Sequence, residues 1–118
     1  MKRTIYFYRY TTNPEAIKQY GSNFIVFKDK IIEETDKQYI LDSTYSYIRK
    51  EMVDNPNEMW NESTNRDINY TWFSMNNNKT NMKIFKKMVK ERLIECERKI
   101  QDELNYMHQL IIGIISEE

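Results

Sequence analysis

The stretch NYTWFSMNNNKT, residues 69–80, gathers aromatic rings and amide side chains in a short space. Tyr70, Trp72 and Phe73 offer flat surfaces on which a planar ring can stack. The asparagines that follow can hydrogen-bond a base edge or a ribose hydroxyl, because each amide carries both donors and an acceptor. They are Asn76, Asn77, Asn78 and Asn81. Asparagine also favours helix starts, so the stretch is either a pocket wall or an ordinary strand-to-helix junction with its caps.

Arginine side chains supply the positive charge that a phosphate-bearing ligand needs, since a guanidinium group can hold phosphate oxygens in pairs. Arg9, Arg49 and Arg66 lie in or beside the strand-like half of the chain, and Arg92 and Arg98 lie in its C-terminal segment. Arg49 alternates with tyrosines in TYSYIRKEMV, so its side chain is expected on one face of a strand. Any one of these arginines is also compatible with an ordinary solvated charge. The hypothesis of a composite pocket therefore concerns the set.

Residues suited to catalysis are few. The chain has only two glycines, Gly21 and Gly113, so it lacks a glycine-rich phosphate loop. Cys96 lies on an apolar helical stripe twelve residues before His108, more than three helical turns away, so the two cannot form a dyad. One cysteine and one histidine argue against a zinc site, because such sites are built mainly from several cysteines and histidines. We expect a binding protein that uses no catalytic residue, metal or cofactor, and not an enzyme.

The totals fit one domain over residues 1–118. Eighteen basic and eighteen acidic residues cancel, so no global field attracts a nucleic-acid polymer or an anionic membrane. The opening MKRTIYFYRY has no long apolar run of the kind found in secretory signals. LIIGII, at 110–115, is far shorter than the ~20 residues that span a bilayer. We therefore expect a cytoplasmic protein with no membrane partner.

Residues 1–75 are expected to form a small antiparallel sheet of four or five strands. In TIYFYRY, at 4–10, both faces carry large side chains, so this strand is expected to be central or covered on both sides. A helical turn is expected from Pro14, and a long loop over 54–67. That loop contains Met59 and Trp60, a hydrophobic pair that either packs back onto its own domain or meets a partner. Further strands are expected twice within 24–43, joined near 35–37, and at 44–53 and 68–74.

Residues 78–116 change period and predict a long amphipathic helix. Apolar residues recur at steps of three and four, which average close to 3.6. They are Phe85, Val89, Leu93, Cys96, Ile100, Leu104, Met107, Ile111 and Ile114. A continuous helix of this length would be roughly 50 Å long, and the sheet portion only about 25–30 Å across. Either the helix breaks, near Glu103 to Tyr106, or its distal half packs on another subunit. With no breaker before Gly113, we favour an α+β protomer that forms a homo-oligomer through its C-terminal helix.

The order of these segments resembles a known group of proteins. TIYFYRY, the hairpin KDKIIEETDKQYIL, YIRKEMVD, the aromatic strand YTWFS and the long closing helix are similar in arrangement to small phage proteins with a sheet before a dimerising helix. Among these the chain most resembles the Thoeris anti-defence signal sponges. The resemblance implies a phage protein, acting in the host bacterial cytosol, that sequesters cyclic ADP-ribose isomers without cleaving them. Some members also capture CBASS-type cyclic oligonucleotides at a second site.

The resemblance also implies ligand-binding residues, in a site between two protomers. By type and position, Arg49 and Arg98 would hold the phosphates, and Phe73, with Trp72, would stack on the base. Asn81, or an asparagine just before it, would supply the amide. Each residue also has a plainer interpretation. Phe73 fits a core, Asn81 fits a surface, and Arg98 can pair with an acidic residue one helical turn away.

Two other functions fit the same sequence. The chain could be a protein-binding inhibitor of a bacterial defence effector, similar to an anti-CRISPR, with Met59 and Trp60 in its contact face. It could also be a non-catalytic phage accessory protein that only oligomerises. The composition alone does not choose among these three.

Overall fold

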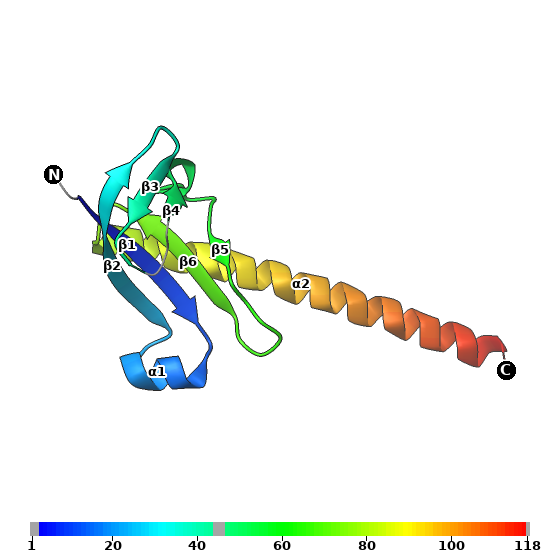
Figure 1. Ribbon diagram of the computed structural model, residues 1–118. Helices are drawn as coiled ribbons and strands as arrows, with labels where there is room; N and C mark the ends of the chain where they lie inside the picture. The colour runs from blue at the N-terminus through cyan, green and yellow to red at the C-terminus, as the bar shows by residue number, and fades with distance from the viewer. Residues whose placement is uncertain (1–2, 44–46, 118) are drawn as a thin grey trace. The chain divides into compact units, whose positions relative to one another are not determined.

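The computed structural model describes residues 3–43 and 47–117, and over these residues the chain has an α+β fold (Figure 1). Six strands form one antiparallel sheet, and a long helix ends the chain. The chain divides into two compact units, the first reaching Met88 and the second starting at Val89. The long helix, α2 (Lys79–Glu117), contributes its first ten residues to the first unit and the rest to the second.

The sheet has the strand order β4-β3-β2-β1-β6-β5, so β1 is central, as predicted from the large side chains on both of its faces. The strands are β1 (Arg3–Thr11), β2 (Phe24–Glu34), β3 (Gln38–Leu41), β4 (Tyr47–Arg49), β5 (Trp60–Asn61) and β6 (Asn69–Ser74). The helices are α1 (Pro14–Tyr20), the 3-10 turn η1 (Lys50–Met52) and α2. The described residues thus form six strands, one more than the upper number predicted.

The additional strand is β5, which lies inside the segment predicted to be a loop. It is only two residues long and pairs with β6. The strand predicted over 44–53 is also shorter than expected, because β4 ends at Arg49 and the backbone then turns into η1. The first part of that prediction, residues 44–46, lies outside the described residues.

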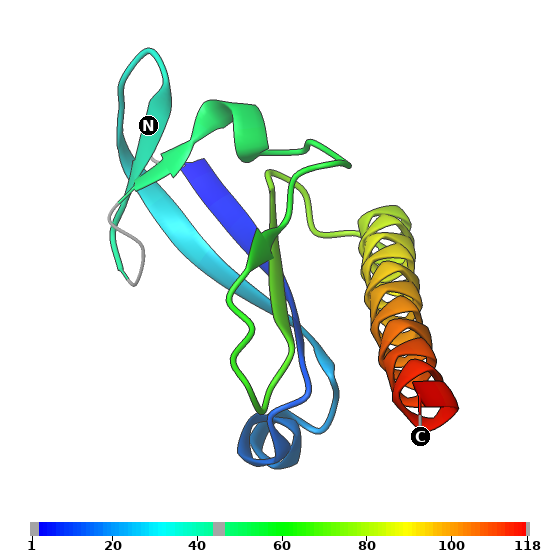
Figure 2. The same ribbon diagram turned by 90° about the vertical axis from the view of Figure 1, so that its right-hand side faces the viewer.

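One face of the sheet carries an apolar core. The sheet curls, as Figure 2 shows, and side chains from β1, β2, β3, β4, β6 and η1 meet on this face. The buried members are Ile5, Phe7, Ile31, Leu41, Ile48, Met52 and Phe73. Trp60 packs against them edge-on to Phe73, with ring centroids 5.1 Å apart. Of the pair Met59 and Trp60, Trp60 therefore packs back onto its own domain, one of the two outcomes predicted.

The opposite face is covered by the first turns of α2. Phe85 of α2 is fully buried, and its ring lies parallel to Trp72 of β6 and inclined to Tyr8 of β1. Phe24 of β2 meets the same ring edge-on, at 5.9 Å between centroids. A fully buried phenylalanine of this kind stabilises a fold by about 1.5–3 kcal/mol. Both sheet faces of the first unit therefore carry aromatic layers.

Helix α1 connects β1 to β2 and confirms the helical turn expected from Pro14. Asn13 caps it, accepting a hydrogen bond from the backbone N–H of Ala16 at 3.0 Å. Gly21 ends it with a φ of 75°, a left-handed conformation that glycine adopts without steric cost. The Asn13 amide also donates to the Asp67 carboxylate at 3.0 Å, which fixes α1 to the loop before β6.

Helix α2 runs without interruption from Lys79 to Glu117 (Figure 1). The break considered near Glu103 to Tyr106 is absent from the structure. Asn78 starts the helix, because its side-chain oxygen accepts from the backbone N–H of Asn81 at 2.8 Å. Neither this helix nor any other among the described residues is long and apolar enough to cross a membrane.

Candidate functional site

The two aromatic residues predicted to stack on a ligand are buried in the first unit. Phe73 is fully buried and meets Phe7 edge-on, at 5.3 Å between ring centroids. Trp72, next to it in β6, points to the opposite face and is 2% exposed. Its indole N–H donates to the carbonyl of Asn55 at 2.9 Å, so its polar atom is also satisfied. Both rings pack within the protein here, and their ligand contacts stay predictions.

Asn81 belongs to a hydrogen-bonded junction that positions the start of α2. Its amide donates to the Ser74 hydroxyl at 2.8 Å and to the Asn76 carbonyl at 3.0 Å. The Tyr8 hydroxyl donates to the same carbonyl at 2.8 Å. Ser74 in turn donates to the Asp54 carboxylate, and Asp54 has a left-handed backbone with φ of 56°. The asparagine-rich stretch therefore forms the capping junction that was one of its two interpretations.

Arg49 lies at the end of β4, on the edge strand of the sheet, with its side chain 68% exposed. Its guanidinium is 3.7 Å from the Glu51 carboxylate, a distance at which an exposed pair contributes little. A shallow hollow of about 580 Å³ lies beside it. The lining residues are Asp36, Lys37, Gln38, Arg49, Lys50 and Glu51. Positive and negative side chains are mixed in this lining, so it carries no strong preference for anions.

Lys50, in the same hollow, is engaged with Glu34. Its ammonium is 2.8 Å from the Glu34 carboxylate, and Arg3 contacts the other oxygen of that group. The hydrogen bond from Lys50, with the charges of Lys50 and Arg3, lowers the pKa of Glu34 below its ordinary value. Two cations are therefore already held by one carboxylate at this edge of the sheet.

Arg98 belongs to the second unit, where it lies on the exposed surface of α2. Over the part of the chain that the structure describes, it pairs neither with Glu95 nor with Asp102. The other four predicted residues all belong to the first unit. Those four do not converge, since two are buried on opposite faces, one lies in the first turn of α2 and one lies on an edge strand.

A different set of residues converges on the sheet face that carries the apolar core. Arg9 of β1 and Thr71 of β6 are directly opposite in the strand register. Such pairs share a face, with their Cβ atoms about 5 Å apart. Thr71 is 1% exposed, and its hydroxyl finds no hydrogen-bond partner among the residues described. Arg9 is partly buried, and within 3–43 and 47–117 it forms no ion pair.

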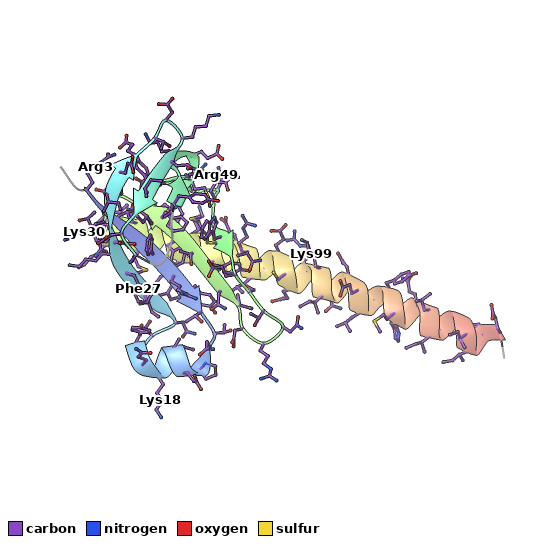
Figure 3. All side chains as sticks on the ribbon, viewed as in Figure 1. Arg3, Lys18, Phe27, Lys30, Arg49 and Lys99 are labelled. Carbon is purple, nitrogen blue, oxygen red and sulfur yellow. The ribbon has the colours of Figure 1, made fainter. Side chains whose placement is uncertain are left out.

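Arg9 and Thr71 both line a hollow of about 310 Å³ whose walls include aromatic rings. Phe7 and Phe27 come from neighbouring strands, and Tyr20 comes from α1. Tyr20 meets Phe27 edge-on with centroids 5.4 Å apart and keeps 47% of its surface exposed. This hollow shares no lining residue with the hollow beside Arg49. Figure 3 labels Phe27 and Arg49, one residue from each hollow.

A neighbouring hollow, of about 210 Å³, continues the 310 Å³ hollow toward α1 and shares Arg9, Tyr20 and Phe27 with it. The threonine and the two asparagines in its lining are already paired. The Thr11 hydroxyl donates to Asn69 at 2.6 Å and accepts from the backbone of Asn13 at 3.1 Å. We call the two hollows together the Arg9 groove. The lining residues are Phe7, Arg9, Thr11, Asn13, Ala16, Tyr20, Ile25, Phe27, Lys28, Ser43, Asn69 and Thr71.

The charges around the Arg9 groove favour an anion. Lys28 also lines the groove. It is opposite Tyr6 in the register, however, so its side chain extends from the other face of the sheet and its ammonium is directed away from the groove. Asp29 is a buried carboxylate on the same sheet face, but it does not line the groove and both of its oxygens already accept hydrogen bonds. It accepts from the Ser43 hydroxyl at 2.7 Å and from the backbone N–H of Lys30 at 2.7 Å. Arg9 is then the charged group inside the groove that forms no ion pair with any described residue.

No family model, no curated protein and no solved structure matches this chain. The site must therefore be judged on its own geometry. The sequence prediction included Arg9 only as one of several arginines and did not include Thr71. One signal was present, because an arginine in the middle of a central aromatic strand has to reach solvent or a ligand. Thr71 had no such signal, since its position opposite Arg9 depends on the strand register.

The second unit offers a surface of another kind. Ten large apolar side chains of α2 are between 46% and 63% exposed. They are Ile94, Ile100, Leu104, Tyr106, Met107, Leu110, Ile111, Ile112, Ile114 and Ile115. Monomeric soluble proteins rarely leave so long a contiguous apolar surface in water. We call the set Leu93, Cys96, Ile100, Leu104, Met107, Ile111 and Ile114 the α2 stripe.

Proposed function

We propose that the protein is a non-catalytic binding protein that captures a phosphorylated nucleotide in the Arg9 groove. The observation that carries the proposal is the pair formed by Arg9 and Thr71. Among the described residues this cation has no ion-pair partner and this buried hydroxyl has no hydrogen-bond partner, and both line a hollow with aromatic walls. A phosphate oxygen can accept from Arg9 directly, and from the buried Thr71 hydroxyl once the side chains around that group shift to admit it. The rings of Phe27 and Tyr20 offer apolar faces for a base. Hollows of about 310 and 210 Å³ suit a small molecule.

Within this proposal the ligand is a cyclic nucleotide messenger, a cyclic ADP-ribose isomer in the first place, and the protein is a phage anti-defence sponge in the host cytosol. The resemblance to the Thoeris signal sponges supports this identity. The groove supports the chemical class, since such messengers carry phosphates and a flat base. A sponge lowers messenger concentration only by holding the molecule. Its affinity must therefore be tight, in the nanomolar range of about −12 kcal/mol.

The protein is further proposed to work as a homo-oligomer through α2. The exposed α2 stripe supports this part of the proposal, because pairing would remove its side chains from water. A protein-binding inhibitor is the second candidate, and the same exposed surface favours it. The two differ in what they retain, because an inhibitor of that kind needs no nucleotide.

Equilibrium binding of the purified protein to four small molecules tests the function. The set is cyclic ADP-ribose, ADP-ribose, AMP and adenosine, of which only adenosine lacks a phosphate. We expect at least one phosphorylated member to bind, and adenosine to bind at least tenfold more weakly. Heating the complex should release the ligand chemically unchanged. If no member is retained, or if the ligand is recovered altered, the proposal of a non-catalytic sponge is wrong.

Matched variants locate the site. Arg9→Gln removes the charge and should weaken binding by roughly 10–150-fold, the range for 1.5–3 kcal/mol of charge-assisted hydrogen bonding. Arg66→Gln makes the same chemical change in the exposed loop before β6 and should leave binding unchanged. Arg49→Gln tests the hollow on the edge strand. If Arg49→Gln abolishes binding and Arg9→Gln does not, the ligand lies beside β4 and the Arg9 groove is not the site.

A further inference from the structure

Charges along α2 are arranged against the helix's own dipole. Residues 79–99 carry eight lysines and arginines and three glutamates, a net charge of +5. Residues 100–117 carry three acidic residues and no lysine or arginine, a net charge of −3. The first turn holds no acidic residue and the last turn no basic one. A helix is stabilised by the reverse arrangement, because its N-terminus is partially positive and its C-terminus partially negative.

This arrangement costs an isolated helix stability, but it favours one kind of partner. A second α2 running in the opposite direction brings the acidic C-terminal end of each helix toward the lysines and arginine at 86–92 of the other. It also opposes the two helix dipoles. A parallel neighbour would instead place basic beside basic and acidic beside acidic, and it would align the dipoles.

The apolar pattern fits a seam between two helices. Members of the α2 stripe are separated by three, four, four, three, four and three residues, an average of 3.5. This is the heptad spacing, in which apolar residues recur every 3.5 residues and face a second helix along a left-handed supercoil. A helix–helix seam of this type needs no break in α2, and α2 is continuous.

From the charges and this pattern we infer that a second copy of the chain covers the α2 stripe, with the two helices antiparallel. The inference rests on the self-assembly proposed above and adds its direction and register. Symmetry about the middle of the stripe places the two-fold axis between Glu103 and Leu104. Leu93 then lies level with the partner's Ile114, Cys96 with the partner's Ile111, and Ile100 with the partner's Met107.

The same register brings charges of opposite sign to one level. Glu117 of each helix comes level with the partner's Lys90, one turn from the partner's Lys86 and Lys87. All these side chains are exposed in the protomer. Exposed pairs contribute only tenths of a kcal/mol each, so they set direction while the apolar stripe supplies most of the stability. High salt should therefore weaken the dimer without abolishing it.

Cysteine cross-linking tests the direction, because Cys96 is exposed and lies in the stripe. A disulfide needs Cα atoms within about 7 Å. In the antiparallel register Cys96 is level with the partner's Ile111, which is fifteen residues from the partner's Cys96. The two native thiols are therefore about 22 Å apart along the helix axis. Wild-type protein should therefore resist oxidation to a covalent dimer. Ile111→Cys, which puts a thiol opposite the partner's Cys96, should cross-link efficiently.

Two controls complete the design. The double variant Cys96→Ser with Ile111→Cys should not cross-link, since the introduced thiols are far from each other. Leu104→Glu, at the axis, should produce a monomer in light scattering, whereas Asn105→Glu, on the next residue, should not. Circular dichroism checks that each variant keeps its helix.

Each outcome decides a different claim. Covalent dimers in oxidised wild type, or in the double variant, would mean that the helices are parallel, and the inference would fail while self-assembly stands. A wild-type protein that stays monomeric at high concentration overturns the assembly itself. Dimers that cross-link only through the pair of positions 96 and 111 support the inference.

Discussion

The unpartnered hydroxyl of Thr71 gives the sharpest test of the groove, because it predicts a variant that is more stable and binds less well. Thr71→Val replaces the hydroxyl with a methyl group of nearly the same shape. The hydroxyl is buried without a hydrogen bond among the described residues, a state that costs about 1–3 kcal/mol. Its removal should therefore stabilise the free protein by about 1–2 kcal/mol, and it should weaken nucleotide binding.

Thr11→Val is the matched control. Thr11 is also a buried threonine, 2% exposed, on the same sheet face in the adjacent strand. Its hydroxyl is paired, however, with Asn69 at 2.6 Å and with the backbone of Asn13 at 3.1 Å. The same chemical change should here cost about 1–3 kcal/mol, since it leaves those partners unsatisfied.

Urea denaturation measures both variants. With a slope of about 1–3 kcal/mol per molar, the midpoints should move by roughly 0.5–1 M in opposite directions. Calorimetric titration with the best-binding nucleotide then reports affinity. If Thr71→Val loses as much stability as Thr11→Val, the Thr71 hydroxyl has a partner in the free protein. The reasoning that assigns it to a ligand would then be wrong.

Three further outcomes test the frame around the site. Phe85→Ala should cost about 3–5 kcal/mol of unfolding free energy, because the ring is fully buried between strands and helix; a loss below 1 kcal/mol would contradict this packing. Asn78→Ala should cost about 0.5–2 kcal/mol through loss of the α2 cap, and Asn78→Asp should restore it. The pKa of Glu34 is lowered in the folded state, first by its hydrogen bond from Lys50, so its stabilising effect is present above the unfolded pKa near 4.5 and is lost as pH falls below it. Glu34→Gln should therefore destabilise the protein at pH 7 and not at pH 3, and an equal loss at both values would exclude this ionic origin.

Much of the architecture could be predicted because local chemistry and period agree. Asn13, Pro14 and Gly21 specify the start and end of α1 through cap and turn geometry. The steps along residues 78–116 specify α2, and the helix lacks a break because nothing before Gly113 disfavours helical backbone. The short strand β5 could not be predicted. A two-residue strand has no period, and it exists because β6 offers it an edge.

The site was harder to predict, because it depends on register. Arg9 and Thr71 are far apart in the sequence and meet only because β1 and β6 pair at one offset. A shift of one residue would turn Thr71 to the other face. Arg49 was expected on the sheet surface and lies there, but β4 is a three-residue edge strand and leaves its side chain in solvent. Phe73 and Trp72 were predicted to contact a ligand because they are aromatic. Aromatic rings favour a buried core as well as stacking on a ligand, so the residue type alone could not distinguish the two.

The two faces of the sheet differ in how they are closed, and this difference explains why a groove remains. The face of Trp72 is covered by the aromatic residues of α2's first turns. The other face is closed at one end by η1 and the curl of β3 and β4, whose residues bury Phe73. At the α1 end the described residues continue this core only with Phe27 and the half-exposed Tyr20, and the chain places Arg9 beside them. A leucine at that position would extend the core past Phe7 with no charge to solvate. Packing alone gives no reason for a partly buried guanidinium beside a hydroxyl that has no partner among the described residues, whereas the proposed anionic ligand would satisfy both groups.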